Sequence, residues 1–207
     1  MGERLKAEIE KLTRCAEGRG AAAAPIRASE VVVADWVGFK CRYGCKGYGK
    51  HLSCPPYAPT PDETRRMLAG YETGLLLRFD GDPAHPDLGP GDIPDDFHPF
   101  FRDLIVWVNG TVHALEKVAF FDGYYKAFGF GAYPCIPEET GGPVDAAAKR
   151  FCRHADVMRP SMEAAGMDVF ATARSVGWPL STIPCENMAY GKIVHGKITS
   201  VALVLIE

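Results

Sequence analysis

Residues 41–63, CRYGCKGYGKHLSCPPYAPTPDE, decide how the chain is interpreted. Three thiols, those of Cys41, Cys45 and Cys54, fall within this stretch. The surrounding segment, 39–61, is rich in Gly and Pro and has neither the helical nor the strand period of apolar residues. Such a segment cannot hold its shape through a hydrophobic core of its own. The sequence therefore predicts an irregular Cys-rich loop over 39–61 that is held by a bound group.

The chemistry of the three thiols points to a soft metal centre. Thiolates prefer zinc or iron–sulfur clusters to hard cations such as magnesium. The stretch 36–61 contains no Asp or Glu, and its cations suit a negatively charged thiolate centre: Lys40, Arg42, Lys46 and Lys50. The net charge of the centre does not distinguish a zinc site from an iron–sulfur cluster. The paired CxxC knuckles typical of structural zinc sites, however, are absent from this sequence. We therefore favour a [4Fe–4S] cluster, with zinc as the alternative.

Two interpretations without a metal remain open for these thiols. Free cysteines often serve as small buried apolar side chains, although this segment offers little apolar periodicity for them to fill. A redox-sensing thiol pair is the other possibility, because a basic loop lowers the pKa of a thiol.

Composition restricts the class of protein. The chain has 207 residues, of which 47% are hydrophobic and 24% charged, which suits one globular domain over 1–207. A net charge of −3 argues against a nucleic-acid-binding protein. No signal sequence and no apolar run long enough for a bilayer is visible, so we expect a cytoplasmic protein that does not contact a membrane. In that compartment, clustered cysteines bind metal more often than they form disulfides.

Local patterns predict an α+β fold with a mainly antiparallel sheet, helices packed on it and Cys-rich loops at one end. Leu5, Ile9 and Leu12 mark a first helix that ends at Gly18. Thr60 and Glu63 form a capping box that begins a second helix, which ends at Gly70. Longer apolar patterns predict helices over 101–119 and 169–176, the latter capped by Asp168, and strands near 30–37, 74–79, 124–130 and 197–206. The tail from 193 onward fits a hairpin about 195–196 or one long closing strand.

A resemblance to a known family covers most of the chain, from about Val33 to the end. It rests on the blocks CRYGCKGYGKHLSCPPYAPTPDE (41–63) and CRHADVMRPSMEAAGMDVF (152–170), on Glu116, and on the closing VALVLIE. The chain resembles an uncharacterised prokaryotic family of predicted metal-binding proteins, which implies iron–sulfur binding through two groups of cysteines. The first group matches Cys41, Cys45 and Cys54.

The second cysteine group lies in an irregular region over 131–160. Relatives typically carry four cysteines there, whereas this chain keeps Cys135 and Cys152 and has PEE at 137–139 between them. One cluster is therefore expected rather than two. Cys15, on the first helix, is expected to be structural. The fourth ligand of the cluster is left open: it is either no residue at all or one of Cys135, Cys152, Cys185, His51, His154 and Glu138.

Three functions follow from a metal centre of this kind, and the sequence leaves open whether the protein is an enzyme. The first is an iron–sulfur protein that passes electrons to a redox partner protein. The second is an enzyme or sulfur-handling protein with a three-cysteine cluster and an open iron, whose small anionic substrate is bound by basic residues: Arg42, Lys46, Lys50, Arg153, His154 and Arg159. The third is a zinc-stabilised interaction domain. Dinucleotide, Walker and nucleophile-elbow motifs are absent.

Overall fold

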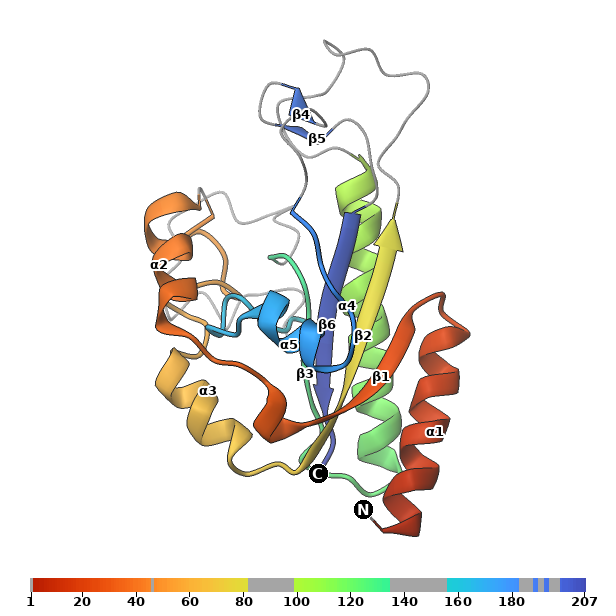
Figure 1. Ribbon diagram of the computed structural model, residues 1–207. Helices are drawn as coiled ribbons and strands as arrows, with labels where there is room; N and C mark the ends of the chain where they lie inside the picture. The colour runs from red at the N-terminus through yellow and green to blue at the C-terminus, as the bar shows by residue number, and fades with distance from the viewer. Residues whose placement is uncertain are drawn as a thin grey trace.

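A four-stranded antiparallel sheet forms the centre of the computed structural model (Figure 1). The structure describes residues 2–45, 47–81, 99–134, 156–182, 188–189, 192–193 and 198–207, the side chains of 99–102, 188–189 and 192–193 excepted. The strand order is β1–β2–β6–β3, with bounds Ala22–Arg27, Thr73–Gly81, Ile198–Leu205 and Phe128–Phe130 respectively. The α+β class predicted from the sequence is confirmed.

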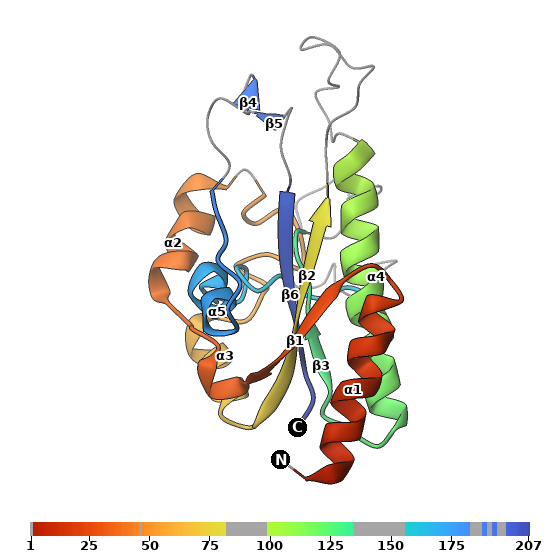
Figure 2. The same ribbon diagram turned by 45° about the vertical axis from the view of Figure 1, so that its right-hand side comes forward.

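Helices cover both faces of this sheet (Figure 2). Helices α1 (Glu3–Glu17) and α4 (Pro99–Phe121) pack on one face, where alternate residues of β2 and β6 meet them. The opposite face carries the shorter helices α2 (Asp35–Gly44), α3 (Pro61–Leu68) and α5 (Val169–Ser175). Because both faces are covered, the middle of β2 (75–77) and most of β6 (201–205) are continuous apolar runs instead of alternating with polar residues.

The capping residues predicted for two of the short helices are confirmed. Thr60 Oγ1 accepts a hydrogen bond from the Glu63 N–H at 3.3 Å, and the Thr60 N–H donates to Glu63 Oε2 at 2.8 Å. Asp168 Oδ1 accepts from the Ala171 N–H at 2.9 Å at the start of α5. These caps fix where α3 and α5 begin, on the face of the sheet that carries the cysteine segment.

Helix α4 is long and apolar enough, over Asp103–Phe121, to cross a bilayer by length and composition alone. In this structure its apolar stripe is buried against α1 and the sheet. The stripe consists of Leu104, Val108, Val112, Leu115 and Ala119. Core packing therefore accounts for the apolar character of one face of α4.

Three local predictions are corrected by the structure, and it adds one strand that was not predicted. The stretch 30–37 is not a strand: Val33 makes one isolated bridge to Met167, and helix α2 begins at Asp35. The edge strand is instead β1, in the alanine-rich run that precedes it, because pairing with β2 outweighs the low strand propensity of alanine. The predicted strand 124–130 is formed only at Phe128–Phe130, since 124–127 makes a turn closed by the Ala127 N–H and Tyr124 O. The predicted loop 39–61 is helical up to Gly44.

The remaining elements are short, apart from the closing strand. Strand β6 is the long closing strand, and it pairs with both β2 and β3. A small hairpin joins β4 (Met188–Ala189) and β5 (Lys192–Ile193), while a one-turn 3₁₀ helix, Ala28–Glu30, follows β1. The alternative hairpin about 195–196 falls outside the described residues.

Close packing of α4 on β3 yields a test of the fold at Gly129. A Cβ atom there would lie 2.3 Å from Val112 Cγ1, and Val112 is fully buried. We expect G129A to lower the free energy of unfolding by about 2 kcal/mol, because the core has no room for the methyl group. The matched control is G110A on α4, where nothing lies within 4 Å of the added Cβ, and which should stabilise the protein by about 1 kcal/mol. Urea unfolding of both variants measures the difference, and equal effects would contradict the packing argument.

A buried carboxyl on α1 makes stability depend on pH. Burial and the neighbouring Asp122 raise the pKa of Glu8 to about 7, and Oε1 of Glu8 has no hydrogen-bond partner among the described residues. The folded state therefore holds this proton more firmly than the unfolded chain, so stability falls as pH rises from about 4.5 to about 7. E8Q should raise the free energy of unfolding by about 2 kcal/mol at pH 8 and change it little near pH 4.5. The exposed neighbour E10Q should show no such dependence.

Candidate metal centre

Cys41 and Cys45 lie at the C-terminal end of α2. Cys41 occupies its last turn, and Cys45 is the residue that caps it, with its N–H 3.4 Å from Cys41 O. A spacing of four residues places two side chains on the same side of a helix, so both thiols face the same region. Cys45 is exposed and Cys41 is half-buried.

Cys54 is brought back toward this helix end by a series of turns. Gly49, at φ +72°, donates its N–H to Pro55 O at 2.9 Å, which closes the loop on itself. The Cys54 N–H donates to His51 O at 3.0 Å, and the Gly47 N–H points at Cys45 Sγ at 3.4 Å. One backbone donor is thus directed at a sulfur, an arrangement of the kind found around iron–sulfur clusters.

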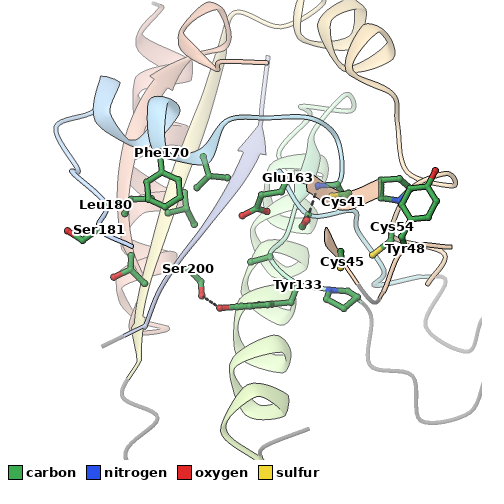
Figure 3. A pocket seen from close by; sticks show the side chains of 18 residues that line it. Cys41, Cys45, Tyr48, Cys54, Tyr133, Glu163, Phe170, Leu180, Ser181 and Ser200 are labelled. Carbon is green, nitrogen blue, oxygen red and sulfur yellow. Dashed lines mark hydrogen bonds between the residues drawn. The ribbon is translucent and has the colours of Figure 1, made fainter. Parts of the chain in front are cut away.

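The three thiols line one cavity of about 310 Å³ (Figure 3). Its cysteine side also contains Tyr48 and Pro55. The remaining walls come from segments that are distant in sequence. The stretch after β3 contributes 132–134, and the turn before α5 contributes Ser161, Glu163 and Ala164. Helix α5 contributes Val169 and Phe170, the stretch after it Leu180 and Ser181, and the start of β6 contributes 199–201. The cavity therefore joins the cysteine segment to the end of the sheet where β6 begins.

Polar and apolar groups share the walls of this cavity. Tyr133 and Ser200 share a hydrogen bond of 2.9 Å between their hydroxyl groups. Tyr133 has a backbone φ of 66°, an unusual value for a bulky residue and a sign of local strain. Phe170 and Leu180 make one part of the wall apolar.

The charge of the lining is one-sided. Among its described residues there is no Lys, Arg or His, whereas Glu163 contributes a carboxyl group beside the three thiols. Protein atoms surround this carboxyl and raise its pKa, although the side chain is open to the cavity. An arrangement of acidic groups without a matching cation is suited to a positively charged guest.

The same environment raises the pKa of two thiols. Burial raises the pKa of Cys54 to about 11, with smaller contributions from Cys45 and Cys41. Burial also raises the pKa of Cys41, assisted by the charges of Cys45 and Glu163. A metal that binds these sulfurs must displace their protons, so its uptake should release protons.

The spacing of the ligands bears on what kind of metal they can hold. In the parts of the chain that the structure describes, no three His, Cys, Asp or Glu side chains converge closely enough to hold one ion. A zinc site brings its donors to about 2.3 Å from a single centre. Iron–sulfur clusters bind each cysteine to a different iron, so their ligands surround a larger volume.

Comparison with known proteins bears on the same centre. A family model described as predicted metal-binding protein (DUF2284) matches residues 24–206. The chain belongs to the DUF2284 family. No curated protein and no solved structure shows a significant match. Membership in DUF2284 supports metal binding, and the resemblance noted from the sequence is confirmed.

Several residues predicted for the DUF2284 site are not among those described. Cys135, Cys152 and Cys185 lie outside the described residues, as do Lys46, Glu138, Arg153 and His154. Whether Cys135 and Cys152 bind the metal therefore stays a prediction. His51 is described and its ring lies 3.3 Å from the place a Cβ at residue 47 would take, but it does not line the cavity. Cys15, on α1, packs against the core as expected.

Arg159 was a candidate for binding an anionic substrate, and the structure gives it another partner. Its Nε donates to Glu116 Oε2 at 2.7 Å, and its Nη2 is paired with Oε1 of the same carboxylate. The Gly129 N–H donates to that carboxylate as well, at 2.7 Å. Arg159 thus fastens the segment before α5 to α4 and β3.

An exposed aromatic and basic face lies next to the cavity, on α2. Trp36, Phe39 and Tyr43 are 45%, 58% and 78% exposed. Lys40 lies 5.1 Å from the ring centre of Trp36, and Arg42 lies 5.5 Å from that of Tyr43. Exposed aromatic residues mixed with cations are typical of protein interfaces.

The sequence interpretation did not identify Glu163, Tyr133 or Ser200 as site residues. Each is distant in sequence from the cysteine segment, and tertiary packing brings it to the cavity. The block RPSMEAAGMDVF, which supported the family resemblance, contains Glu163 and was the one available signal.

Alkylation of the metal-free protein should follow the exposure of its thiols. Iodoacetamide reacts with thiolates, and at pH 8 a thiol with a pKa of about 11 is ionised to roughly one part in a thousand. We expect exposed Cys45 to be alkylated well before half-buried Cys54, as measured by peptide mass spectrometry over time. Equal rates at the two thiols would contradict the described burial.

Proposed function

We propose that the protein binds a [4Fe–4S] cluster through Cys41, Cys45 and Cys54 and serves in electron transfer with a redox partner protein. The observation that carries this proposal is the cavity itself, in which three thiols and a carboxyl meet without a cation among the described lining residues. A cluster supplies one-electron redox chemistry when bound, and the protein supplies thiolates, backbone donors and partial burial.

The absence of the paired CxxC knuckles typical of structural zinc favours a cluster over zinc. Exposed Cys45 places one ligand near the surface, where electrons can pass to a partner. The cationic aromatic face of α2 next to it suits a partner with an acidic surface, because complementary charge speeds encounter.

A second candidate is an enzyme or sulfur-handling protein in which one iron is open to a substrate. It is favoured by the extent of the cavity, which continues past the thiols to Phe170, Leu180 and Ser181. Such a site would hold a small molecule between the cluster and the apolar wall. Cys135 and Cys152, predicted from the sequence as further ligands, remain proposals for the fourth position.

Anaerobic reconstitution with ferrous iron and sulfide tests the proposal. We expect a brown protein with about four irons and four sulfides per chain, which dithionite bleaches and which gives an EPR signal in the reduced state. A colourless protein that instead retains one equivalent of zinc would overturn the proposal in favour of a zinc-stabilised interaction domain. A stable cluster that dithionite cannot reduce, but whose spectrum shifts when small thiols are added, would favour the enzyme.

A further inference from the structure

The larger cavity continues past the thiols into a distal half lined by Phe170, Leu180, Tyr133 and Ser200 (Figure 3). Phe170 and Leu180 make one wall of this distal half apolar, and the hydroxyl groups of Tyr133 and Ser200, hydrogen-bonded at 2.9 Å, add a polar patch. Figure 3 draws the carboxyl group of Glu163 turned away from the three thiols, on the side of the distal half. The cavity volume of about 310 Å³ lies at the lower end of the range for small-molecule sites, about 300–1,000 Å³. The distal half therefore has the dimensions and the mixed lining of a site for a small organic molecule.

The turn that carries Glu163 holds this carboxyl group accessible on a fixed support. Within 161–167, Glu163 is exposed whereas every other residue is buried. The Gly166 N–H donates to Glu163 O at 2.9 Å, and the Thr64 hydroxyl of α3 donates to Ala165 O at 2.7 Å. A side chain on a rigid backbone binds a ligand with a smaller loss of conformational entropy.

The charge of Glu163 is not paired within the described part of the chain. No ion pair joins it to a described Lys, Arg or His. Lys40 lines a smaller cavity of about 240 Å³ that Glu163 also lines, between α2 and α5, but the Lys40 ammonium lies 5.1 Å from the centre of the Trp36 ring. No described Lys, Arg or His lines the larger cavity. The described basic residues that the sequence assigned to an anionic substrate do not line it either: Arg42, Lys50 and Arg159.

We propose that the distal half of the cavity binds a small organic ammonium ion, in which a primary amine is attached to an apolar group of about the size of a phenyl ring. The ammonium group pairs with the Glu163 carboxylate, because a charge-assisted hydrogen bond is stronger than one between neutral groups. The apolar group packs on Phe170 and Leu180 and leaves water. The site goes beyond the proposed metal centre, since it uses none of the thiols. Its ligand lies beside that centre, where the second candidate function requires a substrate.

Calorimetric titration with three probes of matched shape tests the charge of the ligand. Phenethylamine, phenethyl alcohol and phenylpropionate share a phenyl ring and a two-carbon linker, and they end in an ammonium, a hydroxyl and a carboxylate group. We expect the metal-free protein to bind phenethylamine at least tenfold more tightly than phenethyl alcohol, and phenylpropionate more weakly than either. The same order is expected in the reconstituted protein, because a cluster with thiolate ligands adds no positive charge.

Two variants separate the contributions of charge and apolar packing. E163Q keeps the length of the side chain and removes its charge, so it should bind the amine and the alcohol with equal affinity. F170A should weaken the binding of both about tenfold, because the phenyl ring of the probe loses its apolar contact. The exposed control E10Q, on α1, should behave as wild type. Circular dichroism of each variant establishes that it is folded.

Three outcomes would overturn the proposal. The first is equal affinity of the wild type for the amine and the alcohol. The second is a preference for the amine that E163Q retains, because the charge that selects it would then lie elsewhere. The third is a preference that appears only in K40A, since Lys40 would then neutralise Glu163 in the wild type. Failure to take up iron would count against the proposed function alone, because the titrations are made on the metal-free protein.

Discussion

C54S should abolish cluster binding, with iron per chain falling to less than a quarter of the wild-type value after reconstitution. Serine does not supply a thiolate, and Cys54 is the one of the three described thiols that comes from the far end of the loop. Without it, Cys41 and Cys45 at the end of α2 cannot surround a cluster. Iron analysis and the visible spectrum of the reconstituted protein measure the loss.

C15S is the matched control for this variant. Cys15 is also half-buried, but it lies on α1 and packs against the core on the opposite face of the sheet. Its replacement should leave the iron content unchanged. Circular dichroism of metal-free C54S should match that of the wild type, so that loss of iron reports ligation and not folding. Full iron content in C54S would refute the assignment of Cys54.

R159M should destabilise the fold by about 3 kcal/mol, measured by urea unfolding. The side chains of Arg159 and Glu116 are only 16% and 13% exposed, and the change leaves the Glu116 carboxylate without its partner. In this bidentate arrangement two N–H groups of one guanidinium donate to the two oxygens of one carboxylate. A single neighbouring donor therefore cannot replace both hydrogen bonds.

The double variant E116Q/R159M separates coupling from the loss of each side chain. It removes both charges and keeps an oxygen that can accept from the Gly129 N–H. We expect it to regain at least half of the stability lost in R159M. The exposed pair Arg27–Glu30 is the control, and R27A should barely change stability. Additive effects of E116Q and R159M would show that the two groups are not coupled.

Local signals in the sequence were sufficient for the elements that depend on local chemistry. The Thr60–Glu63 capping box, the Asp168 cap and the helix that ends before Gly18 are all present because the groups that form them are neighbours in sequence. The apolar runs of β2 and β6 were equally clear, since both strands are buried on two faces.

Elements decided by tertiary pairing could not be predicted in this way. Val31 and Val33 favour a strand by propensity, yet Val31 packs into the core beside a one-turn helix and Val33 pairs at one point only. Alanines 22–24 have low strand propensity and form β1 because β2 offers a partner. For the same reason the spacing of Cys41 and Cys45 was readable from the sequence, whereas the approach of Glu163 to them was not.

The sheet divides the interior into two cores, and the cysteines and most of the described residues that line their cavity lie on the side of α2, α3 and α5, whereas Ala132 and Tyr133 join the cavity to the other core. Free energy gained from a bound guest would therefore reinforce α2 and the turns after it, while α1 and α4 would stay protected without it. Amide hydrogen exchange should then report occupancy as slower local opening near residues 41–58, with unchanged protection in α4. A cell that cannot load the site would in that case contain a half-ordered protein, exposed to proteases along one side only.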